Sequence, residues 1–183
     1  EDHERHPAFS RLFVKADYLP ELHGLIYTRR PRRPATGPRD RPPVLLHRII
    51  GDGDLPLDIS YETDRRAFLG RDGTAARPAA LTGSSGAGLG GTLGHSLDPV
   101  IALRGRVRLG PGMQCRIGFV TIAAGSTDSA LELARRYGDG AALDWTQDAA
   151  RRATAEQAGA LRLDTGDLAL AQRLASRLLT ADP

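Results

Sequence analysis

The pattern of apolar and polar residues divides the chain into a first part rich in strands and a second part rich in helices. Before about Gly125, short apolar or alternating runs are separated by clusters of Pro, Gly and Asp, as in β-strands joined by turns. Strands are predicted over residues 13–18, 23–29, 44–50 and 57–62. In the last of these, Leu57, Ile59 and Tyr61 alternate with polar residues, so one face of this strand should lie on a core.

The next pattern, over residues 101–119, predicts a β-hairpin. Apolar residues and arginines alternate from residue 101 to residue 109, and Cys115, Ile117 and Phe119 continue the alternation after a turn. The turn itself, Gly-Pro-Gly-Met, has Pro in the second place and Gly in the third, which favours type II geometry. We therefore expect the two strands to pair, with one basic face turned to solvent.

After Gly125 the spacing of apolar residues becomes helical. Helices are predicted behind Ser126 as far as Gly138, over residues 141–158 with Trp145 as the large anchor, and after Thr165 as N-cap. Strands followed by helices, without βαβ alternation, indicate an α+β protein. The expected organisation is an antiparallel β-sandwich over residues 1–125 and a helical segment over residues 126–183.

Composition adds a weak positive charge and excludes two classes of partner. The net charge is +3, and it comes almost wholly from arginine, since Lys15 is the single lysine. The densest basic run, residues 29–41, is interleaved with prolines and lacks stacking aromatics, so it predicts a solvated loop and no nucleic-acid partner. No apolar run reaches the ~20 residues needed to cross a bilayer, so direct membrane insertion is not expected.

Cofactor and metal chemistry are not indicated either. The histidines, His3 and His6 included, do not fall at metal-ligand spacing, and the lone Cys115 is expected as a small buried strand residue. Residues 86–91, GAGLGG, contain the spacing G-x-G-x-x-G but lack the strand, helix and acid of a dinucleotide site. Residues 82–94 are therefore predicted to be a mobile loop, and we expect no cofactor and no metal.

The candidate site lies in residues 61–73, YETDRRAFLGRDG. The preceding strand ends at Thr63 and Asp64, which favour the start of a helix, and arginines then gather where the backbone turns. A guanidinium group offers several hydrogen-bond donors in a fixed geometry. We expect a ligand or partner contact here through Asp64, Arg65 and Arg71.

The acids of this segment raise the question of glycosidase chemistry, which needs two carboxyl groups flanking the sugar bond. Glu62, Asp64 and Asp72 each lie within a few residues of an arginine, which favours the ionised form and disfavours a proton donor. Structural ion pairing of these acids therefore competes with a ligand contact by the arginines. No catalytic residue is assigned.

Four stretches in order carry a family resemblance. They are YETDR with FLGR in the candidate segment, HPAFSRLFV at residues 6–14, LDPVIALR at residues 97–104 and QRLASRLLTADP at residues 172–183. The chain resembles the β-sandwich and linker of glycoside hydrolase family 94, the inverting disaccharide phosphorylases, most closely as found in cyclic β-1,2-glucan synthases. It departs from that pattern at Lys15 and Asp17, where threonine or glutamate is expected, and at Thr180, where tyrosine is expected.

The resemblance implies a partial supersandwich of the mutarotase-like kind, followed by helices that lead toward an (α/α)6 barrel with the catalytic aspartate. That barrel would follow residue 183, so we expect a non-catalytic piece of a longer protein on the cytoplasmic side of the bacterial inner membrane. The implied partners are the barrel of the same parent chain, β-glucan oligosaccharide, phosphate and a second copy in a homodimer.

Two alternatives stay open. The same segment could belong to a stand-alone inverting disaccharide phosphorylase, or the chain could be a carbohydrate-binding module. A binding module would present a platform of exposed Trp and Tyr side chains, whereas the single Trp145 is predicted to lie on a helix.

Overall fold

The computed structural model describes residues 13–30, 41–51, 58–82 and 88–179. It contains two compact units, Glu1–Gly140 and Ala141–Pro183. Several predictions lie outside the described residues: those for His3, His6, Leu57 and Thr180, most of the stretch at residues 6–14, most of the proline-rich loop and glycine-rich residues 83–87.

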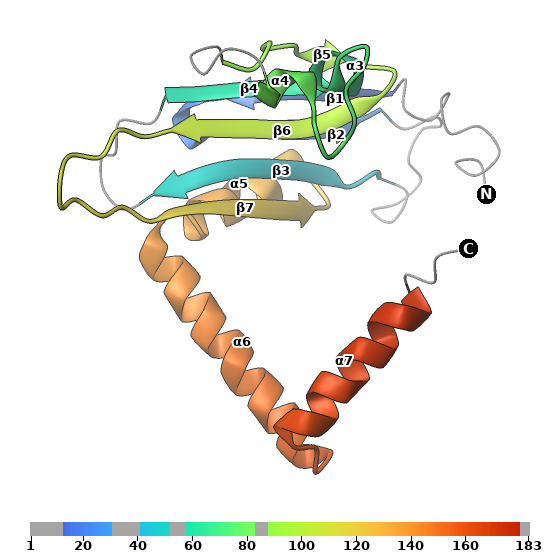
Figure 1. The fold of residues 1–183 in the computed structure, drawn as a ribbon, viewed down its shortest axis with the longest axis vertical. Helices are drawn as coiled ribbons and strands as arrows, with labels where there is room; N and C mark the ends of the chain where they lie inside the picture. The colour runs from blue at the N-terminus through green and yellow to red at the C-terminus, as the bar shows by residue number, and fades with distance from the viewer. Residues whose placement is uncertain (1–12, 31–40, 52–57, 83–87, 180–183) are drawn as a thin grey trace. The chain divides into compact units, whose positions relative to one another are not determined.

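The described strands of the first unit form two antiparallel sheets (Figure 1), which confirms the α+β prediction. The larger sheet has the order β5-β1-β2-β3-β7, and the smaller sheet pairs β4 with β6. The strands are β1 (Val14–Leu19), β2 (Gly24–Arg29), β3 (Val44–Gly51), β4 (Asp58–Asp64), β5 (Gly94–His95), β6 (Pro99–Arg106) and β7 (Ile117–Ala124). A short 3-10 helix, η1 (Pro20–Leu22), joins β1 to β2.

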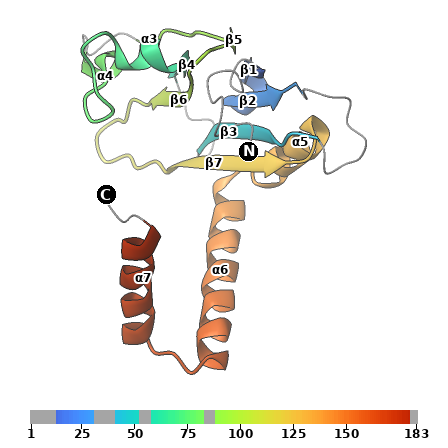
Figure 2. The ribbon, with the colours of Figure 1, turned by 90° about the vertical axis from the view of Figure 1, so that its right-hand side faces the viewer.

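Apolar side chains pack on both faces of the larger sheet, because successive residues along each strand point to opposite faces. On one face, the helix α5 (Thr127–Arg136) packs on apolar side chains of β2, β3 and β7, and Figure 2 shows it beside β3 and β7. The buried residues of the core on this face are Leu22, Ile26, Val44, Leu46, Ile122, Ala130 and Ala134. On the other face, Tyr61 of β4 and Leu103 of β6 pack against Ala16, Leu25 and Tyr27.

Contacts between the two sheets confirm that Tyr61 faces the core. Its ring stacks on that of Tyr18 with centroids 4.4 Å apart. The hydroxyl of Tyr27 donates a hydrogen bond of 2.7 Å to the carbonyl of Val100. Burial raises the pKa of Tyr27, so this hydroxyl stays a donor.

The predicted hairpin over residues 101–119 is wrong, because its two strands belong to different sheets. Strand β6 pairs with β4, and strand β7 pairs with β3. The predicted turn does form, since the N–H of Met113 donates to the carbonyl of Gly110 at 3.1 Å and Gly112 has φ of 73°. It serves a connection between sheets, and Cys115 lies in that connection, half-buried, rather than in a strand.

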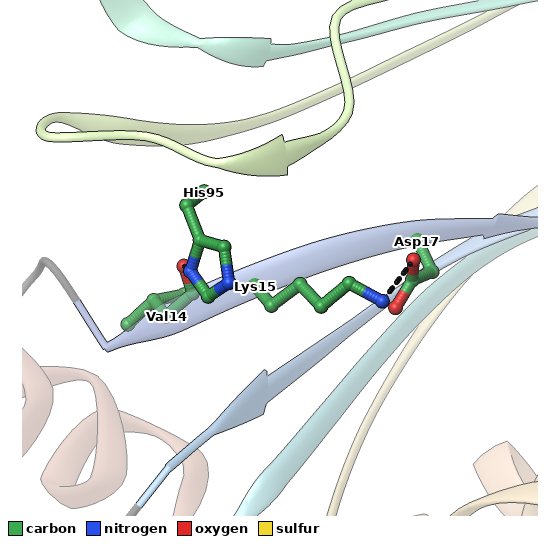
Figure 3. A network of polar contacts seen from close by, with 4 residues as sticks. All are labelled: Val14, Lys15, Asp17 and His95. Atoms are coloured by element: carbon green, nitrogen blue, oxygen red, sulfur yellow. Dashed lines mark hydrogen bonds and ion pairs between the residues drawn. The ribbon is translucent and has the colours of Figure 1, made fainter.

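A small polar cluster joins β5 to β1 (Figure 3). His95 pairs with Lys15 in the sheet, and its Nδ1 lies 3.1 Å from the carbonyl oxygen of Val14, to which it must donate. Lys15 also forms an ion pair of 2.9 Å with Asp17. Two of the three departures from the family pattern, Lys15 and Asp17, are therefore partners of each other, and such an exposed pair contributes little to stability.

Helix α5 begins behind Ser126, as the helical spacing predicts, and Ser126 is its N-cap: its hydroxyl accepts a hydrogen bond from the N–H of Ser129 at 3.2 Å. Although the sequence places this helix in the helical segment, α5 packs on the larger sheet, and the first compact unit extends to Gly140.

The second unit consists of α6 (Gly140–Ala160) and α7 (Thr165–Leu179). Two details differ from prediction. Trp145 is 60% exposed and is no anchor within the described residues. The cap of α7 is Asp164 rather than Thr165, since the N–H of Asp167 donates to Asp164 Oδ1 at 2.8 Å and Asp167 Oδ2 accepts from the N–H of Asp164.

Candidate functional site

The candidate segment starts at an irregularity in strand β4. Glu62 pairs with Ala102 of β6, but the next pairing joins Asp64 to Pro99, so the single residue Thr63 lies opposite two residues of β6, Val100 and Ile101. The extra residue on β6 makes this a β-bulge, which disrupts the ladder locally and increases its twist. The pairing of β4 with β6 is therefore irregular at the point where the chain leaves the sheet.

Asp64 is the N-cap of the short helix α3 (Arg65–Leu69). Its Oδ1 accepts a hydrogen bond of 2.9 Å from the N–H of Ala67, and its Oδ2 accepts one of 2.7 Å from the hydroxyl of Ser96. These bonds favour the ionised carboxyl, and they hold the pKa of Asp64 below its usual range, with the Ala67 N–H as the largest cause. Asp64 is thus an anion that fixes the start of the helix.

Replacing Asp64 by alanine is expected to lower the free energy of unfolding by about 1 kcal/mol, the usual effect of losing an N-cap. Because the folded-state pKa is the lower one, this stabilisation is complete above the unfolded-state pKa of about 3.9 and is lost as pH falls through the folded-state value. Denaturant unfolding of both proteins at neutral pH and at decreasing acid pH measures the difference. A difference that stays constant throughout the acid range would contradict this assignment.

The turn after α3 depends on two glycines. Gly70 ends the helix with φ of 76°, and a Cβ built there would lie 2.5 Å from the Cβ of Ala79 in the helix α4 (Ala79–Thr82). A Cβ at Gly73 would overlap the carbonyl oxygen of Leu69. The backbone of this turn therefore packs back closely on its neighbours, while Arg71 between the two glycines stays exposed.

Two open cavities flank this turn. One, of about 520 Å³, is lined by Arg71, Asp72, Gly73, Thr74, Arg77, Ala79 and Thr82. The other, of about 560 Å³, is lined by Asp64, Arg66, Ala67, Gly70 and Arg71. Guanidinium groups donate hydrogen bonds and accept none, so these linings suit acceptor-rich ligands such as sugar hydroxyl oxygens or phosphate.

The three predicted site residues are placed differently. Asp64 lines one cavity and Arg71 lines both, whereas Arg65 is exposed and absent from both linings. Arg77 was not predicted. It comes back to the turn through reciprocal backbone hydrogen bonds with Thr74, of 3.0 and 3.3 Å, and no recognised sequence motif marks that arrangement.

Glu62 differs from the ion-paired acid that the sequence suggested. It is only 1% exposed, and its carboxyl group accepts hydrogen bonds from the N–H groups of Thr63 and Asp64 and from the hydroxyl of Thr92. A carboxyl group buried in this way cannot reach a sugar bond. This placement removes Glu62 from any pair of catalytic carboxyl groups.

The predicted mobile loop at residues 82–94 is corrected in its described part. The N–H of Gly91 donates to the carbonyl of Tyr61 at 2.8 Å, and the hydroxyl of Thr63 donates to the carbonyl of Thr92 at 2.8 Å. Residues 88–92 therefore lie along β4. The glycines permit that close approach, since a Cβ at Gly88 would already lie 3.1 Å from that of Ser60.

The described residues contain no candidate metal site and no candidate membrane-spanning helix. No group of three or more His, Cys, Asp or Glu side chains could hold a metal ion in that part of the chain. Among the helices of the described ranges, none has both the length and the apolar character to cross a membrane.

Comparison with known proteins places this architecture. The sequence model of the glycosyl hydrolase 94 supersandwich domain matches residues 1–140. The cyclic beta-(1,2)-glucan synthase NdvB of Rhizobium meliloti (strain 1021) is 35% identical over 133 residues, which are 72% of this chain and 4% of that protein. The chain thus spans a small part of this relative's length. Because the family match covers the whole unit that carries the two sheets and the arginine-lined turn, the chain belongs to the glycosyl hydrolase 94 supersandwich family.

Proposed function

We propose that this chain is a non-catalytic β-sandwich and linker segment of a cyclic β-1,2-glucan synthase, and that it supports the region of that protein that processes β-1,2-glucan. The observation that carries the proposal is the 35% identity over 133 residues to a protein with that name. The chain spans 4% of that relative, so the reacting groups would lie in other parts of the parent protein.

The geometry of the candidate segment supports a binding role more than a chemical one. Asp64 is held as an anion by its cap, and Glu62 is buried, so neither carboxyl group is placed to protonate a leaving group. Arg71 lines both cavities and offers donors to hydroxyl or phosphate oxygens. The proposed contribution of Asp64, Arg65 and Arg71 is contact with glucan, with phosphate or with a second subunit.

The second unit would serve as the linker to the (α/α)6 barrel of the same parent chain. In α7, Leu170, Leu174 and Leu178 recur every fourth residue and are each at least half exposed. Residues four apart share one side of a helix, so these leucines form an apolar stripe suited to packing on another helix. In this proposal the segment works on the cytoplasmic side of the bacterial inner membrane.

The test is the double variant Arg65→Ala and Arg71→Ala in the longer parent protein. Phosphate-dependent shortening of β-1,2-glucan is expected to slow about tenfold, the effect of losing ~1.4 kcal/mol of charged hydrogen bonding to the ligand. The length distribution of the glucan and the mass of the assembled protein are measured together. A charge-matched control, Arg135→Ala with Arg136→Ala on α5, should leave both unchanged.

An unchanged glucan length distribution and an unchanged assembly in the double variant would refute the proposed contact. The stand-alone phosphorylase is the second candidate, because the family match covers it equally. It would replace the synthase if the parent gene encoded neither membrane spans nor a second sandwich upstream. The binding-module alternative is weaker, since the exposed Phe119 and Trp145 lie in different compact units.

A further inference from the structure

Glu62 is buried at the point where the register of β4 breaks. A bulge frees backbone N–H groups from the ladder, and a buried N–H without a partner is costly. Here one carboxyl oxygen of Glu62, Oε1, accepts hydrogen bonds from the N–H groups of Thr63 and Asp64, both at 2.8 Å. The side chain of Glu62 therefore satisfies the backbone groups at the bulge.

The second carboxyl oxygen of Glu62 connects the bulge to a segment distant in sequence. Oε2 accepts a hydrogen bond of 3.2 Å from the hydroxyl of Thr92. A Cβ built on Gly90 would collide with this same oxygen, so the backbone of Gly90 lies directly against the carboxyl group. Residues 90–92 cover Glu62 and exclude water from it.

The same distant segment continues to the start of the arginine-bearing helix. Ser96 donates its hydroxyl to Asp64, and its own oxygen accepts from the N–H of Asp98 at 3.2 Å. The carbonyl of Asp98 accepts from the N–H of Arg65 at 2.9 Å. Residues 90–98 thus hold β4 at Glu62 and α3 at its first residue.

The geometry points to Glu62 as a positioning residue, whose carboxyl group acts as a three-bond acceptor that fixes the bulge, the covering segment 90–98 and thereby the direction of α3. Its role is to accept hydrogen bonds rather than to balance an arginine. The inference goes beyond the proposed function and does not depend on it, because it concerns the placement of α3 whatever that helix contacts.

The test compares Glu62→Leu with Glu62→Gln by hydrogen–deuterium exchange of the full chain. Leucine removes every acceptor, and amide exchange over residues 62–70 and 88–98 is expected to speed up about tenfold or more relative to β2 and β3. Glutamine keeps an acceptor oxygen at the same length, so its exchange should stay within about threefold of the original protein. Protected amides in the leucine variant, or equal loosening in both variants, would overturn the inference.

A second pair of variants, with smaller changes, tests the inference if the leucine variant fails to fold. Thr92→Val removes the hydroxyl that binds Glu62, while Thr121→Val removes a hydroxyl 2.8 Å from His47 Nδ1 in the other sheet. Only Thr92→Val should speed exchange over residues 88–98, by about threefold or more. Equal exchange there in the two valine variants would overturn the role of Glu62. This readout is independent of sugar binding by Arg65 or Arg71.

Discussion

Replacing Arg48 by alanine is expected to lower the free energy of unfolding by about 3 kcal/mol, through a lost charged hydrogen bond and the cavity left behind. Arg48 lies on β3, on the face that α5 covers, and is 8% exposed. Its Nη1 donates a hydrogen bond of 2.6 Å to the carbonyl of Ala134 in the last turn of α5. Carbonyls there have no partner within the helix, so Arg48 ties α5 to the sheet.

Burying the guanidinium of Arg48 also costs free energy. The loss of stability should therefore depend on which residue replaces it. Burial lowers the pKa of Arg48, and its Nε has no hydrogen-bond partner among the described residues. Methionine fills the space without a charge to bury, so Arg48→Met is expected to cost only about 1 kcal/mol.

Urea unfolding measures these differences. The control is Arg135→Ala, because Arg135 is an exposed arginine of α5, and it should lower the free energy of unfolding by about 0.5 kcal/mol or less. An alanine variant as stable as the control would show that Arg48 does not hold α5.

Replacing Gly73 by alanine is expected to cost about 2 kcal/mol and to displace the turn that carries Arg71. The added Cβ would overlap the carbonyl oxygen of Leu69 and lie 2.8 Å from its carbon atom. Both are backbone atoms, so relief requires the turn or α3 to move. Any ligand contact made by Arg71 in the parent protein should weaken with it.

Gly125→Ala is the matched control, because a Cβ there meets nothing within 4 Å. Its free energy of unfolding should stay within about 0.5 kcal/mol of the original. Exchange of amides over residues 66–74 reports the displacement directly. If Gly73→Ala matched Gly125→Ala in both measurements, the close packing of the turn would be refuted.

The strands, the order of elements and the family were predictable because they depend on local alternation and on contiguous motifs. Tyr61 faces the core as its alternation indicated, and α5 begins behind Ser126 as the helical spacing of its apolar residues indicated. The failed hairpin shows the limit of that reasoning. A type II turn is encoded by neighbouring residues, whereas the partner of each flanking strand is chosen by burial across the whole unit.

The candidate site was predictable only in part for the same reason. Asp64 and Arg71 belong to one short motif, so the sequence alone identified both as candidate site residues. The partners that hold Asp64 and Glu62 are Ser96 and Thr92, about thirty residues further along the chain. Nothing local distinguishes these hydroxyls from those of a solvated loop.

Strands β6 and β7 follow each other in the chain but belong to different sheets, and this affects how the protein folds during synthesis. Strand β3 is completed early, but its partner β7 emerges only after β4, β5 and β6. Pairings between such distant residues require closure of a long loop and therefore form slowly. Until residue 124 has left the ribosome, the edge of β3 is unpaired, and nascent chains are then most exposed to aggregation.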